Sequence, residues 1–241
     1  MKKPIFIILA SVFLLFLGSS TAMAAPYGIE VGDDVSFTTP GPTFGGALGL
    51  TTGGGEFDFS AQDDGFAWTS YCAELGEPVK KDKLYRVVGL SDRAIGGGGN
   101  DNFMTEPGYD LLSDASAWLF WTFTWNPIAL GYTGTNQDQI DLQGVLWYLE
   151  DEVSDAAWTD PTTGRTATMQ NWFNAATAAA GGGWTNNGRV AVVNLQYFDP
   201  VEQEWTVAQD QLIAVPIPSA ILLLASGLLG LIGIRRFKGR G

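Results

Sequence analysis

The stretch DLLSDASAWLFWTFTW, residues 110–125, decides how this chain folds. Drawn as a helix, it carries apolar and aromatic side chains on nearly every face, which is typical of a helix buried at the centre of a domain. Pro127 follows closely and is expected to end the helix. A ligand-binding groove lined by these aromatic rings is the alternative use of such a segment.

Two further helices are expected downstream of this segment. One covers residues 137–152, with Thr135 or Asn136 as its N-cap and Asp138 in its first turn. The other covers residues 167–180 and stops at three consecutive glycines.

Strands are expected on both sides of these helices. Short segments with alternating apolar and polar residues, the pattern of half-buried strands, occur early and late in the chain. They cover residues 35–38, 56–59, 66–71, 84–88, 189–197 and 204–208, whereas residues 95–102, with four consecutive glycines, are predicted to form a loop. The order predicts an α+β domain with strand-rich N-terminal and C-terminal parts around inserted helices.

The N-terminus has the pattern of an export signal. Lys2 and Lys3 precede an apolar run over residues 5–17, and the small residues of Ala22-Met23-Ala24 follow it. This order predicts a signal peptide, residues 1–24, that signal peptidase removes. A retained anchor is the alternative, but 13 residues are few against the ~20 of a spanning helix.

The C-terminal tail, residues 213–241, predicts a membrane segment. Residues 213–234 form a stretch of 22 residues without a charge, and a transmembrane helix needs about 20. Four basic residues follow, which the positive-inside rule keeps in the cytoplasm. The domain between the two ends, residues 25–212, is therefore expected on the outer side of the membrane.

The tail also resembles a known sorting signal. Val215-Pro216-Ile217-Pro218 precedes the apolar run, and Arg235 and Arg236 follow it. This arrangement is similar to the PEP-CTERM signal of Gram-negative bacteria, although that family most often has Glu at the position of Ile217. The resemblance implies recognition by an exosortase, cleavage near Pro218, and release from the inner membrane to the cell surface or extracellular matrix. A permanent C-terminal membrane anchor is the plain alternative.

Composition excludes several functions for the central domain. Outside the two ends, 188 residues carry 7 basic against 26 acidic side chains, a net charge of −19, which repels nucleic acid. The chain has no His, which excludes His-assisted hydrolases and most zinc or haem sites. Its single cysteine, Cys72, cannot form an internal disulfide.

Clusters of acidic residues predict no metal site. Asp33-Asp34, Asp63-Asp64 and Glu150-Asp151-Glu152 are expected on the solvated surface. The stretch Asn136-x-Asp138-x-x-Asp141 lacks the central Gly and terminal Glu of a calcium-binding loop. Paired carboxylates can also serve a secreted hydrolase, although no pair is singled out by the sequence. No cofactor is expected.

Two short segments suggest a specific chemistry. Tyr71-Cys72-Ala73-Glu74 closes a predicted strand, and Leu142-Gln143-Gly144-Val145-Leu146-Trp147 lies on the second predicted helix. These segments resemble the two motifs of the thioester domains of bacterial surface adhesins. The match places Cys72 and Gln143 on the reactive positions and Tyr71 and Trp147 in packing positions. Leu142 and Val145 depart from the family pattern, which has Thr and Ala there.

The resemblance implies adhesion or matrix attachment through a Cys72–Gln143 thioester that an amine-bearing surface or matrix polymer opens. Such a bond is used once, so no enzyme is predicted. A related fold in which the bond does not form is one alternative. A non-covalent structural or carbohydrate-binding component of the polysaccharide matrix is the second function considered, and the secreted hydrolase is the third.

Overall fold

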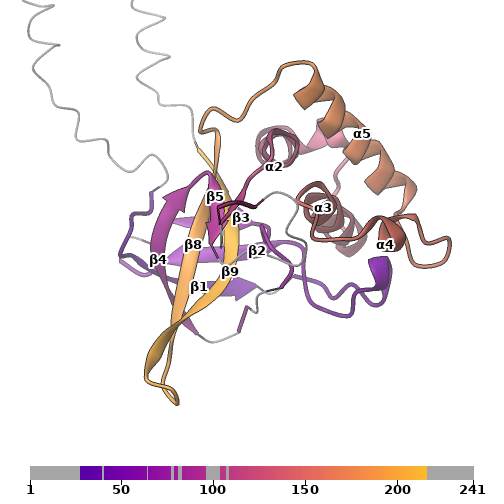
Figure 1. The fold of residues 1–241 in the computed structure, drawn as a ribbon. Coiled ribbons are helices and arrows are strands. Elements are labelled where there is room, and N and C mark those ends of the chain that lie inside the picture. Colours follow the sequence, from indigo (N-terminus) through magenta and orange to yellow (C-terminus); the bar gives the residue numbers. More distant parts are fainter. Residues whose placement is uncertain are drawn as a thin grey trace, which may run out of the picture.

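The computed structural model describes residues 28–39, 41–63, 65–76, 79–80, 83–95, 104–106 and 109–215. In this part of the chain the domain is α+β, as predicted, with a six-stranded sheet, a three-stranded sheet and four α-helices. Figure 1 shows the helices gathered beside the large sheet rather than spread around it. All four helices come between the strands in the sequence, so the prediction of inserted helices is confirmed.

The large sheet has the strand order β3-β2-β1-β4-β8-β9, and every neighbouring pair is antiparallel. Its inward-facing side chains alternate with outward-facing ones, as in β2, where Phe57, Phe59 and Ala61 are buried. The strands are β1 Asp34–Thr39, β2 Phe57–Ala61, β3 Ala67–Ser70, β4 Leu84–Ser91, β8 Val190–Asp199 and β9 Glu204–Ala214.

The two outer strands of this sheet also meet each other. Just after β3, the Tyr71 carbonyl accepts a hydrogen bond from the Leu212 N–H of β9 at 3.0 Å, and the Ala73 N–H donates to the Asp210 carbonyl at 2.9 Å. Cys72 thereby pairs with Gln211 in an antiparallel bridge. The large sheet thereby closes on itself into a barrel along this seam, which removes two exposed edges.

The helices are α2 Asp114–Trp125, α3 Asn136–Leu149, α4 Asp155–Thr159 and α5 Ala167–Gly181. Each begins at a Ser or Thr whose side-chain oxygen accepts a backbone N–H of the first turn. Thr135 and Asp138 form a full capping box at the start of α3, so Thr135 is the N-cap. Helix α4 was not predicted, because five residues are too few to show a period.

Residues 110–125 are partly strand and partly helix. Asp110 belongs to a short strand, β7 Tyr109–Leu111, and the helix begins only at Asp114 because Ser113 caps it. Leu119 and Phe120 of α2 are fully buried. The prediction of a centrally buried helix is wrong at its C-terminal end, where Trp125 is 52% exposed.

Strand β7 lies in a small sheet of order β5-β7-β6, with β5 Arg93–Ile95 and β6 Met104–Glu106. This sheet flanks the predicted glycine loop, most of which falls outside the described residues. Its strands of three residues were not predicted, since such short segments show no alternation.

Two predictions about the acidic stretch after α3 are wrong. Helix α3 ends at Leu149, three residues earlier than predicted. Glu150 and Glu152 are only 6% and 5% exposed, so they are not solvated surface. The Glu150 carboxylate accepts hydrogen bonds from the Ser113 N–H at 3.2 Å and the Ser113 hydroxyl at 2.6 Å. These partners come from the start of α2 and make the burial possible.

Strand β9 extends six residues beyond its predicted end and reaches Ala214. Ile213 and Ala214 are thus part of the folded domain, beyond the predicted boundary at residue 212. Val215 is also buried, and its N–H donates to the Arg189 carbonyl at 2.7 Å. Within the described residues no helix has the length and hydropathy to cross a membrane. The predicted signal peptide and residues 216–241 of the tail lie outside that part.

Candidate functional site

The predicted reactive residues Cys72 and Gln143 lie side by side. The Cys72 N–H donates to Gln143 Oε1 at 2.9 Å, and Gln143 Nε2 donates to the Cys72 carbonyl at 2.8 Å. The two residues are 71 positions apart in the chain and both are fully buried. The amide of one therefore lies directly against the backbone of the other.

The seam of the barrel explains why Cys72 can accept this contact. In an antiparallel pair, backbone groups point alternately toward and away from the neighbouring strand. The Tyr71 carbonyl and the Ala73 N–H form hydrogen bonds with β9, so the N–H and C=O of Cys72 between them point away from β9. Buried backbone groups need partners, and Gln143 supplies both.

Helix α3 presents Gln143 to this seam through close packing of its neighbours. Gly144 lies so near Leu48 and Met169 that a Cβ there would stand 2.8 Å and 2.9 Å from their side chains. Both of these residues are buried. A larger side chain at Gly144 would push α3 outward and withdraw the Gln143 amide.

A glycine-rich loop packs against the Gln143 side chain. A Cβ at Gly54 would meet Phe44 at 2.6 Å, Trp147 at 2.9 Å and the Gln143 side chain at 3.2 Å. Phe44 stacks on the fully buried Trp147 with ring centroids 5.1 Å apart. Trp147, one helical turn beyond Gln143, is therefore packed between Phe44 and the glycine-rich loop.

Tyr71, the other predicted packing residue, is fully buried against helix α2. Its ring makes an edge contact with Phe123 at 5.2 Å. Its hydroxyl lies 3.0 Å from the Tyr132 hydroxyl, which donates to Glu56 Oε2 at 2.6 Å. Burial, followed by the neighbouring Tyr132, raises the pKa of Tyr71 well above its usual value. Tyr71 therefore stays neutral and anchors the seam to the helices.

The sulfur of Cys72 faces a group that the sequence did not single out. Gln211 of β9 donates from Nε2 to Cys72 Sγ at 3.4 Å, and Gln211 is itself fully buried. Burial raises the pKa of the Cys72 thiol, the Gln211 hydrogen bond lowers it, and the nearby Glu74 raises it again. Burial dominates, so the resting group is a neutral thiol. The sequence gives no local sign of this contact, because Gln211 lies 139 residues away from Cys72 in the chain.

A second cluster of buried acids was also missed. Asp110 and Glu150 are both buried, and burial raises the pKa of Glu150 to about 7. Burial, with Glu152 and Asp151 nearby, raises the pKa of Asp110 to about 6. Within the described residues no three His, Cys, Asp or Glu side chains are arranged to hold a metal ion.

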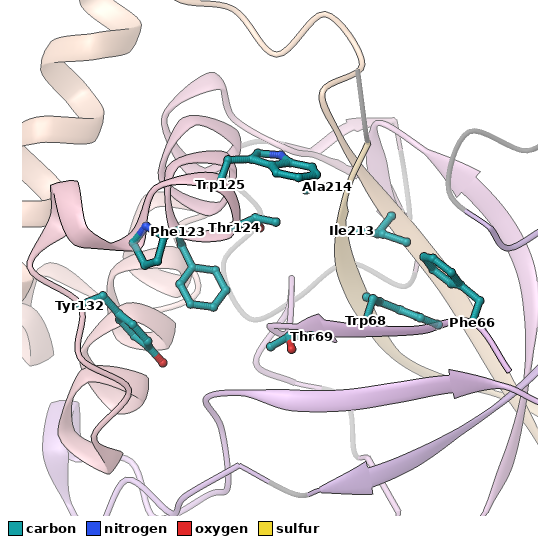
Figure 2. A pocket seen from close by; sticks show the side chains of 10 residues that line it. Phe66, Trp68, Thr69, Phe123, Thr124, Trp125, Tyr132, Ile213 and Ala214 are labelled. Atoms are coloured by element: carbon teal, nitrogen blue, oxygen red, sulfur yellow. The ribbon is translucent and has the colours of Figure 1, made fainter. Parts of the chain in front are cut away.

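An aromatic pocket opens near the barrel seam. Its volume is about 460 Å³. Figure 2 shows Phe123, Trp125 and Tyr132 on one side and Phe66 and Trp68 on the other. The remaining lining residues are Thr69, Thr124, Pro127, Ile213 and Ala214, so none of the described residues around it is charged.

Of the predicted sorting motif, only Val215 is described, and Pro216, Pro218, Arg235 and Arg236 fall outside that part. A comparison with known protein families finds no family that matches this chain. Searches of characterised proteins and of solved structures likewise return no match.

Proposed function

We propose that this chain is an exported protein that attaches to a surface or matrix polymer through a thioester between Cys72 and Gln143. One observation carries the proposal. The Gln143 amide bonds both backbone groups of Cys72 in a site that is fully buried. These two bonds hold the Gln143 amide beside residue 72, and holding two reacting residues close together lowers the entropic part of the barrier between them.

The reaction needs only these two side chains. The Cys72 sulfur attacks the Gln143 amide carbon, an S–C bond forms, and the C–N bond breaks. The thiol proton leaves with the amide nitrogen as ammonia. An amine on the target then attacks the same carbon, which forms an amide bond and returns Cys72 as a thiol. The event occurs once per molecule, so the protein is not an enzyme.

The surroundings of the pair fit a protected thioester. The loop at Gly54 lies against Gln143, Trp147 and Phe44, and Gln143 is fully buried, which keeps water from the acyl carbon. Tyr71 ties the Cys72 segment to α2 on the other side. The thioester-domain-like fold remains part of the proposal and rests on the two motifs and on this contact.

Intact mass tests the bond. The purified full chain should be lighter by one ammonia than its sequence predicts, apart from any removal of its ends. Methylamine should add to it and expose one thiol. Cys72→Ala should abolish both effects. An unchanged mass with a freely titrating thiol in the folded protein would leave Gln143 with a purely structural role.

We also propose that the two ends direct export, with signal peptidase removing residues 1–24. The tail then anchors the domain in the inner membrane of a Gram-negative bacterium until an exosortase processes it near Pro218. Cell fractionation followed by peptide mapping of both ends tests this route. Full-length, unprocessed chain in the cytosol would contradict it.

A second candidate function is non-covalent binding of matrix polysaccharide in the aromatic pocket. Its rings offer flat apolar faces, and Thr69 and Thr124 supply hydroxyl groups. Trp125 is 52% exposed at its edge. Retention on immobilised polysaccharide should fall in Trp125→Ala. It should persist in Trp205→Ala, which removes a ring 44% exposed that does not line the pocket.

A further inference from the structure

Gln211 faces Cys72 directly across the barrel seam. The backbone hydrogen bonds on either side of them, Leu212 N–H to Tyr71 O and Ala73 N–H to Asp210 O, make Cys72 and Gln211 a non-hydrogen-bonded pair. In such a pair the two side chains lie on one face of the sheet at their closest spacing. The position of Gln211 beside the sulfur thus follows from the register of β9.

Three contacts fix the orientation of the Gln211 amide. Its Nε2 donates to Cys72 Sγ at 3.4 Å and to the Gln209 carbonyl at 3.4 Å. Its Oε1 lies 3.1 Å from the Ser70 hydroxyl, whose single proton has a shorter bond, 2.7 Å, to the Leu212 carbonyl. A carbonyl oxygen can only accept, so the Gln209 contact requires the NH₂ group on the side of the sulfur.

The Gln211 amide is buried beside a weak hydrogen-bond acceptor. Gln211, Ser70 and Cys72 are all fully buried. Burying a primary amide is costly unless its groups are satisfied, and a thiol is a weak acceptor compared with an oxygen. A sulfur that carries negative charge is a much stronger acceptor, because hydrogen bonds to charged groups are about twice as strong as neutral ones.

We infer that Gln211 holds the Cys72 sulfur in position and stabilises the negative charge on it when the thioester forms and when an amine opens it. In formation, the S–H bond breaks and sulfur gains charge before the S–C bond is complete. In opening, the S–C bond breaks and its electron pair stays on sulfur until a proton returns. Gln143 on helix α3 carries the acyl carbon and bonds the Cys72 carbonyl. Gln211 on strand β9 donates to the Cys72 sulfur.

The inference rests on the proposed thioester, and the chain offers a closely matched control for testing it. Gln209 lies two residues earlier on β9 and is only 5% exposed, and its side chain donates to the Glu74 carbonyl rather than to the sulfur. Gln211→Met and Gln209→Met each replace a buried amide with an apolar side chain of similar length. Only the first removes the donor to Cys72.

The full chain of each variant is treated with methylamine, and the loss of thioester is followed by intact mass. The rate of opening should fall at least about tenfold in Gln211→Met, since donors aimed at developing charge contribute on this scale. It should change less than about twofold in Gln209→Met, in which no group that contacts the sulfur is removed. Equal rates in the two variants would overturn the role of Gln211 and leave the thioester standing. A wild-type chain without a thioester would overturn both.

A spectroscopic measurement separates this role from simple packing. After methylamine has opened the bond, Cys72 is the only thiol in the protein, so the infrared S–H stretching band belongs to it alone. The band should shift in Gln211→Met and stay in place in Gln209→Met. An unshifted band in Gln211→Met would show that the amide does not hold the sulfur.

Discussion

Removing the Gln143 amide should destabilise the domain even when no thioester can form. In a Cys72→Ala background the bond is impossible, but the N–H and C=O of residue 72 remain. These are the two groups that Gln143 satisfies, at 2.9 Å and 2.8 Å. A further Gln143→Leu substitution would leave both groups buried without a partner.

The magnitude follows from the cost of an unsatisfied buried polar group. Each costs about 1–3 kcal/mol, so the double variant should lose about 2–6 kcal/mol of unfolding free energy. That is a large part of the total stability of about 5–15 kcal/mol typical of a domain. Guanidinium unfolding of the full chain in mild detergent, followed by tryptophan fluorescence, measures the difference.

Asn174→Leu in the same background is the control. Asn174 lies on helix α5 and is exposed, and its Oδ1 accepts a hydrogen bond from Gln170 Nε2 at 2.8 Å. Its substitution should cost less than about 1 kcal/mol. A loss of similar size in the two double variants would refute the claim that the Gln143 amide fastens helix α3 to the seam.

Three other results are expected. Unfolding free energy should fall as pH rises from about 5 to 8, because the native pKa of Glu150, about 7, and that of Asp110, about 6, lie above their unfolded values. Glu150→Gln should flatten this slope, and a wild-type curve that rises over the range would contradict it. Gly54→Ala should lower the unfolding free energy by about 1–3 kcal/mol through overpacking, because the added Cβ would press on Trp147. It should also speed hydrolysis of the thioester. Unchanged values of both would show that the loop moves aside at no cost. Trp125→Ala should leave the unfolding free energy within about 0.5 kcal/mol of wild type while weakening polysaccharide retention, and a loss of both would make Trp125 a structural residue.

Local patterns in the sequence predicted much of the fold. Period-two segments located five of the six strands of the large sheet to within a few residues, and the Thr135 N-cap was among the alternatives named. The predicted strand over residues 204–208 ends too early because Gln209-Asp210-Gln211 interrupts the alternation of apolar residues in β9. These residues are buried because the closed seam and distant donors satisfy them, as when Asp210 accepts the Ile95 N–H at 2.6 Å.

The candidate site was predicted only through its motifs. A strand ending in Cys72 and a helix carrying Gln143 give no sign by themselves that they meet. Their contact depends on the closure of the sheet, which leaves the backbone of Cys72 free for Gln143. Gln211 and the buried acids Glu150 and Glu152 depend on partners far away in the chain, so local patterns could not reveal them.

A peptide map at low pH tests the central claim most directly, since digestion in acid spares a thioester from attack by amines. The untreated full chain should give one joined species, in which the peptide with Cys72 is linked to the peptide with Gln143 and the pair lacks one ammonia. Methylamine treatment should separate the two peptides. Recovery of both as separate peptides before treatment, with Cys72 open to alkylation, would contradict the account.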